Sequence, residues 1–159
     1  MKKLLVVCAI ICLISVANAL PVGVELGAGY TIHENNDHFF ISGGALVNIH
    51  ENFYLRTTLA QLSFFEDGNS IYIGTGSGLD LMMFSYAPKF APYGLGGLHI
   101  NNGGGVTSIN LRLGVGSEFE ISKAFKPFAE ISLDVIRTST SGNSNTETPV
   151  TIKGGIRIK

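Results

Sequence analysis

The sequence predicts an all-β fold: one eight-stranded antiparallel up-and-down barrel that crosses a membrane. Three observations predict it. Apolar and polar residues alternate along successive stretches of about ten residues, with turn residues between them, as expected of strands with two different faces. Beyond residue 20 no apolar run reaches 18 residues, so no helix of this chain spans a bilayer. The polar face consists mainly of Gly, Ser, Thr and Asn, which suit a narrow lumen.

The first 19 residues predict a secretory signal peptide that precedes the barrel. Two lysines come before an apolar run from Leu4 to Ile14, and a small-residue stretch ends at Ala19. The apolar run is shorter than the ~20 residues that a transmembrane helix needs. We therefore expect cleavage after Ala19 and a barrel domain over residues 20–159.

Removing residues 1–19 leaves 140 residues, with 9 Lys and Arg against 12 Asp and Glu, a net charge of −3. This length predicts one domain, and the charge indicates no nucleic-acid partner. The only cysteines, Cys8 and Cys12, lie in the expected signal peptide, so we expect neither disulfides nor thiol chemistry. No pattern indicates a cofactor. A chain without a spanning helix enters lipid only as a closed sheet, because every backbone polar group must be paired internally.

The strands follow in order from the alternation, beginning with VGVELGAGYTI, where Glu25 stands among glycines on the polar face. In chain order the alternating stretches are 22–32, 39–49, 53–59, 71–81, 90–100, 111–121, 129–135 and 150–158. The expected connections are 33–38, 50–52, 65–70, 82–89, 101–108, 122–126 and 138–149. These connections are too short for crossovers, which predicts antiparallel pairing throughout.

The fifth strand breaks the alternation. Leu95 and Leu98 cannot share a face of a regular strand, and two glycines separate them. We expect a glycine β-bulge here, which would return Leu98 and Ile100 to the apolar side and turn His99 to the polar side.

Alternation alone fits two opposite barrels: a soluble lipocalin-like barrel with an apolar cavity, and a membrane barrel with a polar lumen. The small residues of the polar face, the alternation of short and long connections, and aromatic residues near strand ends favour the membrane barrel. The expected aromatic girdle comprises Phe39, Phe53, Tyr54, Phe64, Phe65, Phe84, Tyr86, Phe90, Tyr93 and Phe128.

Four stretches carry a family resemblance: GVELGAGY, APYGLGGLHI, LRLGVGSEFEIS and PFAEISL. They resemble strand motifs of the small eight-stranded outer-membrane β-barrels of Gram-negative bacteria, the OmpA/OmpX-like and porin-family proteins. The likeness covers nearly all of residues 20–159. It implies an outer-membrane location with both termini in the periplasm, contact with outer-membrane lipid and lipopolysaccharide, and insertion by the barrel-assembly machinery. One departure is the end of the sequence at Lys159, where family chains usually carry an aromatic residue.

Charged residues recur on the polar faces. The predicted lumen charge network comprises Glu25, Arg56, Asp80, Arg112, Glu118, Glu120, Glu130, Asp134, Lys153 and Arg157. A hairpin that closes the 138–149 loop would pair Arg137 with Val150. This register puts two carboxylates opposite two bases, Asp134 opposite Lys153 and Glu130 opposite Arg157. We interpret the network as salt bridges that tie the barrel shut, since unpaired charges would be costly there. A gated ion path, in which the pairs exchange partners, is the alternative.

One enzymatic hypothesis starts from His99. Outer-membrane lipid A deacylases resemble this architecture and use a His-x-Ser-Asn stretch with a downstream Glu. Here Asn101 stands where the serine belongs, and an amide cannot attack an ester. The nearby hydroxyls, Thr107 and Ser108, are expected in a loop, and Glu118 is not at the family spacing. We therefore expect no catalytic site and interpret His99 as a lumen or rim residue.

Two further clusters have simpler interpretations. Glu118 and Glu130 would suit acid/base catalysis if they approached each other, but nearby bases favour ordinary ion pairs. The first loop holds four potential metal ligands, His33, Glu34, Asp37 and His38. Imidazole and carboxylate groups bind divalent cations, yet a solvated turn is the favoured interpretation, and we expect no metal site.

The sequence thus predicts a non-enzymatic integral outer-membrane barrel with a structural or surface-interaction role and a closed or weakly conducting lumen. The alternatives are a lipid A-modifying hydrolase and a secreted soluble lipocalin-like carrier.

Overall fold

The computed structural model describes residues 22–34, 37–66, 68–73, 78–85, 87, 89–103, 106–122, 124–140 and 143–159. The expected signal peptide and its two cysteines lie outside these residues, as does Tyr86 of the expected girdle. In the described part of the chain no helix is long and apolar enough to cross a membrane.

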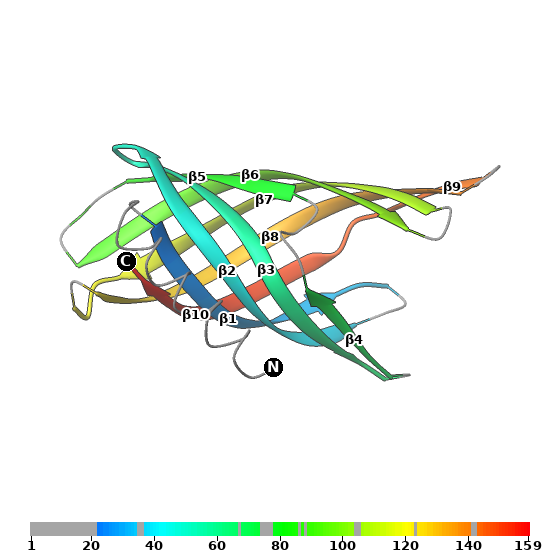
Figure 1. Ribbon diagram of the computed structural model, residues 1–159, viewed down its shortest axis with the longest axis horizontal. Coiled ribbons are helices and arrows are strands. Elements are labelled where there is room, and N and C mark those ends of the chain that lie inside the picture. The colour runs from blue at the N-terminus through cyan, green and yellow to red at the C-terminus, as the bar shows by residue number, and fades with distance from the viewer. Residues whose placement is uncertain are drawn as a thin grey trace, which may run out of the picture.

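The fold is a closed, eight-stranded antiparallel transmembrane β-barrel. Its strands are β1 (Val22–Ile32), β2 (His38–His50), β3 (Phe53–Phe65), β4 (Gly68–Ile73), β5 (Gly78–Phe84), β6 (Phe90–Gly103), β7 (Val106–Phe119), β8 (Phe125–Thr140), β9 (Asn143–Glu147) and β10 (Val150–Ile158). Strands β4 and β5 both pair with β3, while β9 and β10 both pair with β8, so the ten strands occupy eight positions around the barrel. The barrel closes where β10 pairs with β1, and Figure 1 shows the strands winding around one long axis.

The two ends of the barrel differ. Strand β1 begins and β10 ends at one of them, which we call the terminal end, where β2–β3, β5–β6 and β7–β8 are also joined. Strands β1–β2, β3–β4, β6–β7 and β8–β9 are joined at the opposite end, which we call the hairpin end. The β6–β7 and β8–β9 strand pairs extend far along the hairpin end (Figure 1).

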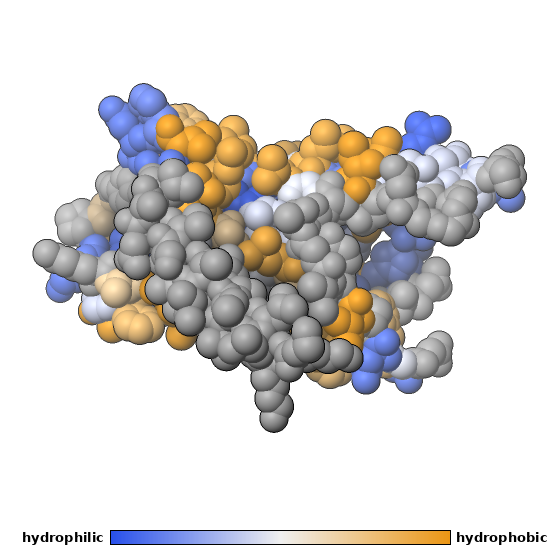
Figure 2. Space-filling view, in the orientation of Figure 1, coloured by the Kyte–Doolittle hydropathy of each residue, from blue (hydrophilic) through white to orange (hydrophobic). Residues whose placement is uncertain are grey.

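Apolar side chains face outward. Leu26, Ile41, Leu113 and Ile156 are 45–67% exposed, whereas the polar positions that alternate with them face the lumen and are largely buried. Figure 2 shows hydrophobic residues along the barrel wall and hydrophilic residues toward its two ends. An apolar exterior with charged residues inside is the arrangement of a membrane barrel, so the soluble carrier with an apolar cavity is excluded.

Several expected connections are too long. The loop expected at 101–108 is mostly strand, because β6 extends to Gly103 and β7 begins at Val106. The turn expected at 82–89 is shorter, because β5 continues to Phe84 and β6 begins at Phe90. The polar loop expected at 138–149 is largely strand, since β8 extends to Thr140 and β9 pairs with it from Asn143. The prediction of a loop was wrong because this hairpin projects beyond the apolar band of the barrel. Its strands are polar on both faces, so they show no alternation in the sequence.

The glycine bulge expected in the fifth strand is absent. Strand β6 pairs with β5 and β7 without a register shift at Gly96 or Gly97. Leu95 simply faces the lumen, where it is 6% exposed, while Leu98 faces outward and is 48% exposed. A register shift lies instead between β2 and β3, where Gly43 pairs with Ala60 and Gly44 with Thr58.

The aromatic girdle is only partly as expected. Phe39, Phe64 and Phe90 are exposed on the outside, and Phe90 packs against Phe119 with ring centroids 5.5 Å apart. In contrast, three residues assigned to the girdle are buried in the lumen at 2–4% exposure: Phe84, Tyr93 and Phe128. Position near a strand end does not separate the two groups, whereas the period of two does, since Phe84 and Phe128 share the parity of Asp80 and Glu130.

Candidate functional site

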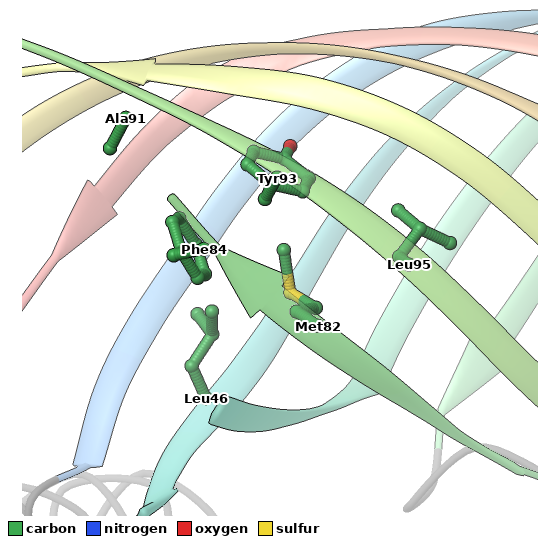
Figure 3. Packing of buried hydrophobic residues seen from close by; sticks show 6 residues of the cluster. All are labelled: Leu46, Met82, Phe84, Ala91, Tyr93 and Leu95. Atoms are coloured by element: carbon green, nitrogen blue, oxygen red, sulfur yellow. The ribbon is translucent and has the colours of Figure 1, made fainter. Parts of the chain in front are cut away.

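The lumen is the candidate site, and toward the terminal end it contains a cluster of buried apolar side chains beside Arg157 and Lys159. The buried cluster contains Leu46, Met82, Phe84, Ala91, Tyr93 and Leu95, with Tyr54 packed against it. Figure 3 shows that these side chains come from β2, β5 and β6 and converge on one another. Close packing of these side chains narrows the lumen at this level. This cluster was not among the expected lumen residues.

Arg56 is the centre of the ion pairs. Its Nη1 and Nη2 donate to Glu130 Oε2 and Oε1 at 2.6 and 3.0 Å. Its Nε donates to Asp80 Oδ2 at 2.8 Å, and Glu25 Oε2 lies 3.6 Å from Nη1. All four side chains are at most 3% exposed. One guanidinium therefore offsets charge from three buried carboxylates, which use its planar array of donors.

Arg157 is completely buried, with 0% exposure. Its Nε donates to Glu25 Oε2 at 2.8 Å, and its Nη1 donates to Glu118 Oε2 at 3.3 Å. The guanidinium carbon also lies 4.1 Å from the ring centroid of Phe128 and 4.6 Å from that of Tyr93. Aromatic rings and ion pairs together hold this side chain across the lumen.

Nearer the hairpin end, Arg112 and His99 form a second group of polar contacts. Arg112 Nε donates to Asp134 Oδ1 at 2.8 Å, and Asn110 donates to the same oxygen at 2.7 Å. His99 Nε2 lies 2.8 Å from Asp80 Oδ1, which joins this group to Arg56. His99 thus faces the lumen although no bulge turns it inward.

The expected register of the last hairpin is wrong by four residues. Strand β10 places Lys153 opposite Glu130 and Arg157 opposite Lys126. The shift arises because β9 continues the pairing that was expected to be loop. An even shift keeps every side chain on its face, so Lys153 still enters the lumen, where its Nζ donates to Glu25 Oε1 at 2.5 Å.

The network includes residues that were not predicted and omits one that was. Lys159 Nζ donates to Glu118 Oε2 at 2.8 Å, and Lys126 Nζ lies 3.7 Å from Glu118 Oε1. Both lysines continue the alternation of their strands. Extending the expected strands to include them would have predicted that they face the lumen. Tyr93 joins the network by donating to Glu130 Oε2 at 2.9 Å. Glu120 is exposed beyond the end of β7, and the described ion pairs do not include it.

The described lumen charges nearly balance. Five carboxylates, from Glu25, Asp80, Glu118, Glu130 and Asp134, meet six bases, from Arg56, Arg112, Lys126, Lys153, Arg157 and Lys159. Burying a charge without a partner is costly, so the network is stable only as a set of pairs. The arrangement ties opposite sides of the barrel together.

The described residues do not form the geometry needed for acid/base catalysis, for ester cleavage or for a metal site. Glu118 and Glu130 are both within 3.7 Å of Arg157, which makes them ion-pair partners of a base. His99 is held by Asp80, and Thr107 and Ser108 lie in β7 rather than in a loop. His33 of the first loop pairs with Glu147 at 3.0 Å. Among the described residues there is no group of three or more His, Cys, Asp or Glu side chains that could hold a metal ion.

Comparison with known proteins adds the fold alone. No protein-family model and no curated protein sequence matches the chain. Neisserial surface protein A (NspA) matches with a TM-score of 0.59 and 13% identity, over 87% of this chain and 95% of that one. The N-terminal β-barrel domain of Pseudomonas aeruginosa OprF matches with a TM-score of 0.51 and 15% identity, over 86% and 97%. Both are eight-stranded outer-membrane barrels. The chain therefore shares their architecture.

Proposed function

We propose that this transmembrane barrel resides in the outer membrane of a Gram-negative bacterium as a non-enzymatic protein with a sealed lumen and a structural or surface-interaction role. Its terminal end then faces the periplasm and its hairpin end the cell surface. The observation that carries the proposal is Arg157, a fully buried side chain held between Phe128 and Tyr93 and paired with Glu25 and Glu118.

Two layers support a sealed lumen. The apolar cluster around Met82 and Phe84 packs beside Arg157 and Lys159 and occupies the periplasmic half of the lumen. The ion pairs around Arg56 fill the next layer. An ion would have to break several buried charge pairs to pass, which favours structural pairing over the gated path.

The geometry gives no support to the lipid A-modifying alternative. Acyl-ester cleavage in the membrane needs a nucleophile and base that reach lipid. His99 points into the lumen, its side chain is 12% exposed, and its Nε2 is engaged by Asp80. The hairpin end instead offers an exposed polar surface, with β9 residues Asn143–Thr146 all exposed, in keeping with a role in contact at the cell surface.

Three measurements test the proposal. The protein should fractionate with the outer membrane and should migrate differently in SDS gels before and after boiling, because a closed barrel resists SDS until heated. Reconstituted in planar lipid bilayers, it should give no discrete conductance steps. Stable openings of the wild-type protein would refute the sealed lumen, and recovery in the soluble periplasmic fraction would refute the location.

A further inference from the structure

One charged side chain breaks the pattern of the outer surface. Among the described strand residues, Arg137 of β8 is the single Asp, Glu, Lys or Arg on the outward face. It is exposed, and its neighbours Ile136 and Thr138 point to the opposite face. In the described part of the chain no ion pair engages it. An arginine in this position lies just above Val135, an outward apolar residue that is 38% exposed.

Hydroxyl groups lie beside Arg137 on the same face, with Ile109 of β7 on its other side. Strand pairing puts Thr146 of β9 directly opposite Arg137, and Ser139, two residues further along β8, opposite both Thr107 and Ser144. Directly opposed side chains lie about 5 Å apart at Cβ. The three strands β7, β8 and β9 therefore present one guanidinium and four hydroxyls together at the hairpin end. We call these five residues the Arg137 cluster.

An apolar groove lies below the Arg137 cluster. Its lining includes Gly94, Leu113, Val115, Ile131, Leu133 and Val150. Arg137 and Leu133 are four residues apart on β8, about 13 Å along the strand. This distance is within the ~15 Å depth of one leaflet of hydrocarbon. One acyl chain of a single leaflet is therefore long enough to reach from the level of Arg137 into this groove.

We infer that this face binds a single outer-leaflet lipid that carries a phosphate monoester, with the phosphate on the Arg137 cluster and an acyl chain in the groove. The inference rests on the outer-membrane location proposed above. Arginine donates to phosphate oxygens at two points, and the hydroxyls add further donors, Thr146 beside Arg137 and the other three two residues further along the strands. The opposite charges of guanidinium and phosphate specify the headgroup, while the apolar lining specifies a lipid rather than a soluble phosphate.

Each half of the site has a substitution that tests it without touching the lumen. Arg137→Gln removes the charge and keeps a polar, hydrogen-bonding side chain. Gly94→Leu fills the groove, and it should not strain the fold because a Cβ added at Gly94 meets no heavy atom within 4 Å. Lys89→Gln is the matched control, since it removes an exposed basic side chain at the periplasmic end.

The experiment measures lipid binding to the detergent-solubilised barrel by native mass spectrometry. The probes are diphosphoryl lipid A, the same lipid after phosphatase treatment, and inorganic phosphate as competitor. Wild type and Lys89→Gln should retain the phosphorylated lipid, Arg137→Gln should bind it about tenfold more weakly, and phosphatase treatment should abolish that difference. Gly94→Leu should weaken both forms of the lipid.

Three results would overturn the inference. Equal lipid binding by Arg137→Gln and wild type would show that Arg137 does not contact the headgroup. An equal loss of binding in Lys89→Gln would show that only the net charge of the protein matters. Displacement of the lipid by inorganic phosphate at equal concentration would show an anion site without a lipid. These readouts do not involve conductance, so failure of the lipid site is distinguishable from failure of the sealed lumen.

Discussion

Arg56 and Glu130 form a two-point ion pair directly across the barrel. Arg56 lies on β3 and Glu130 on β8, four positions apart in the ring of eight. Their Nη1–Oε2 and Nη2–Oε1 distances are 2.6 and 3.0 Å. The pair bridges the full width of the lumen, so it holds together strands that have no backbone hydrogen bonds to each other.

Because Arg56 serves three carboxylates, its loss should cost more stability than the loss of any one of them. Arg56→Met leaves Glu130, Asp80 and Glu25 without this partner and should lower the free energy of unfolding by about 3–5 kcal/mol. Glu130→Gln keeps the contact geometry and should cost about 1–3 kcal/mol. Urea unfolding in detergent micelles measures both, with the exposed Lys89→Met as control. Equal costs for the two lumen variants would contradict a central role for Arg56.

Removal of the Arg157 side chain should open the lumen. Arg157→Ala deletes the group that fills the space between Phe128 and Tyr93, and it leaves Glu118 with only lysine partners. Single-channel recordings should then show conductance steps that the wild type lacks. Arg157→Gln, which keeps more of the side-chain volume, should conduct less. An Arg157→Ala variant that gives no conductance steps, yet still changes its gel mobility on heating, would show that other residues seal the lumen.

The orientation of β6 can be tested with single introduced cysteines. The only native cysteines, Cys8 and Cys12, lie in the expected signal peptide and would be removed with it. Leu95→Cys should be shielded from lipid, and Leu98→Cys should face it, as their exposures of 6% and 48% require. A fluorophore on each cysteine, quenched by brominated lipid, reports the difference. Strong quenching at position 95 would mean that the bulge exists after all.

Two glycines on neighbouring strands should respond oppositely to the same methyl group. A Cβ at Gly116 would collide with the ring of Tyr93 and lie 2.7 Å from the carbonyl oxygen of Ala129, whereas a Cβ at Gly94 meets nothing within 4 Å. Gly116→Ala should therefore destabilise the barrel by about 1–3 kcal/mol, and Gly94→Ala should not destabilise it. Midpoints of thermal unfolding in micelles compare the two directly. A neutral Gly116→Ala would mean that Tyr93 moves aside freely.

Much of the architecture is legible in the alternation itself. The period of two assigns Ile41 and Leu113 to one face, and Glu25 and Arg112 to the other, whatever the register. Antiparallel neighbours and a closed sheet follow from short connections and from the need to satisfy the backbone in lipid. Because the period is two, the error of four residues in the register of the last hairpin did not change the face of Lys153, which still lies in the lumen.

Details that depend on distance were decided by the tertiary structure. The alternation fixes a face but not a height, so it could not show that the inward-facing Phe84 and Tyr93 meet Leu46 in one buried cluster. It likewise could not pair Arg56 with Glu130, because partners across a barrel are set by the positions of their strands around the ring. The sequence by itself determined which side chains face lipid and which face inward, since the pleat enforces that choice locally. Only closure of the barrel decided which inward charges meet, because those contacts join residues far apart in the chain.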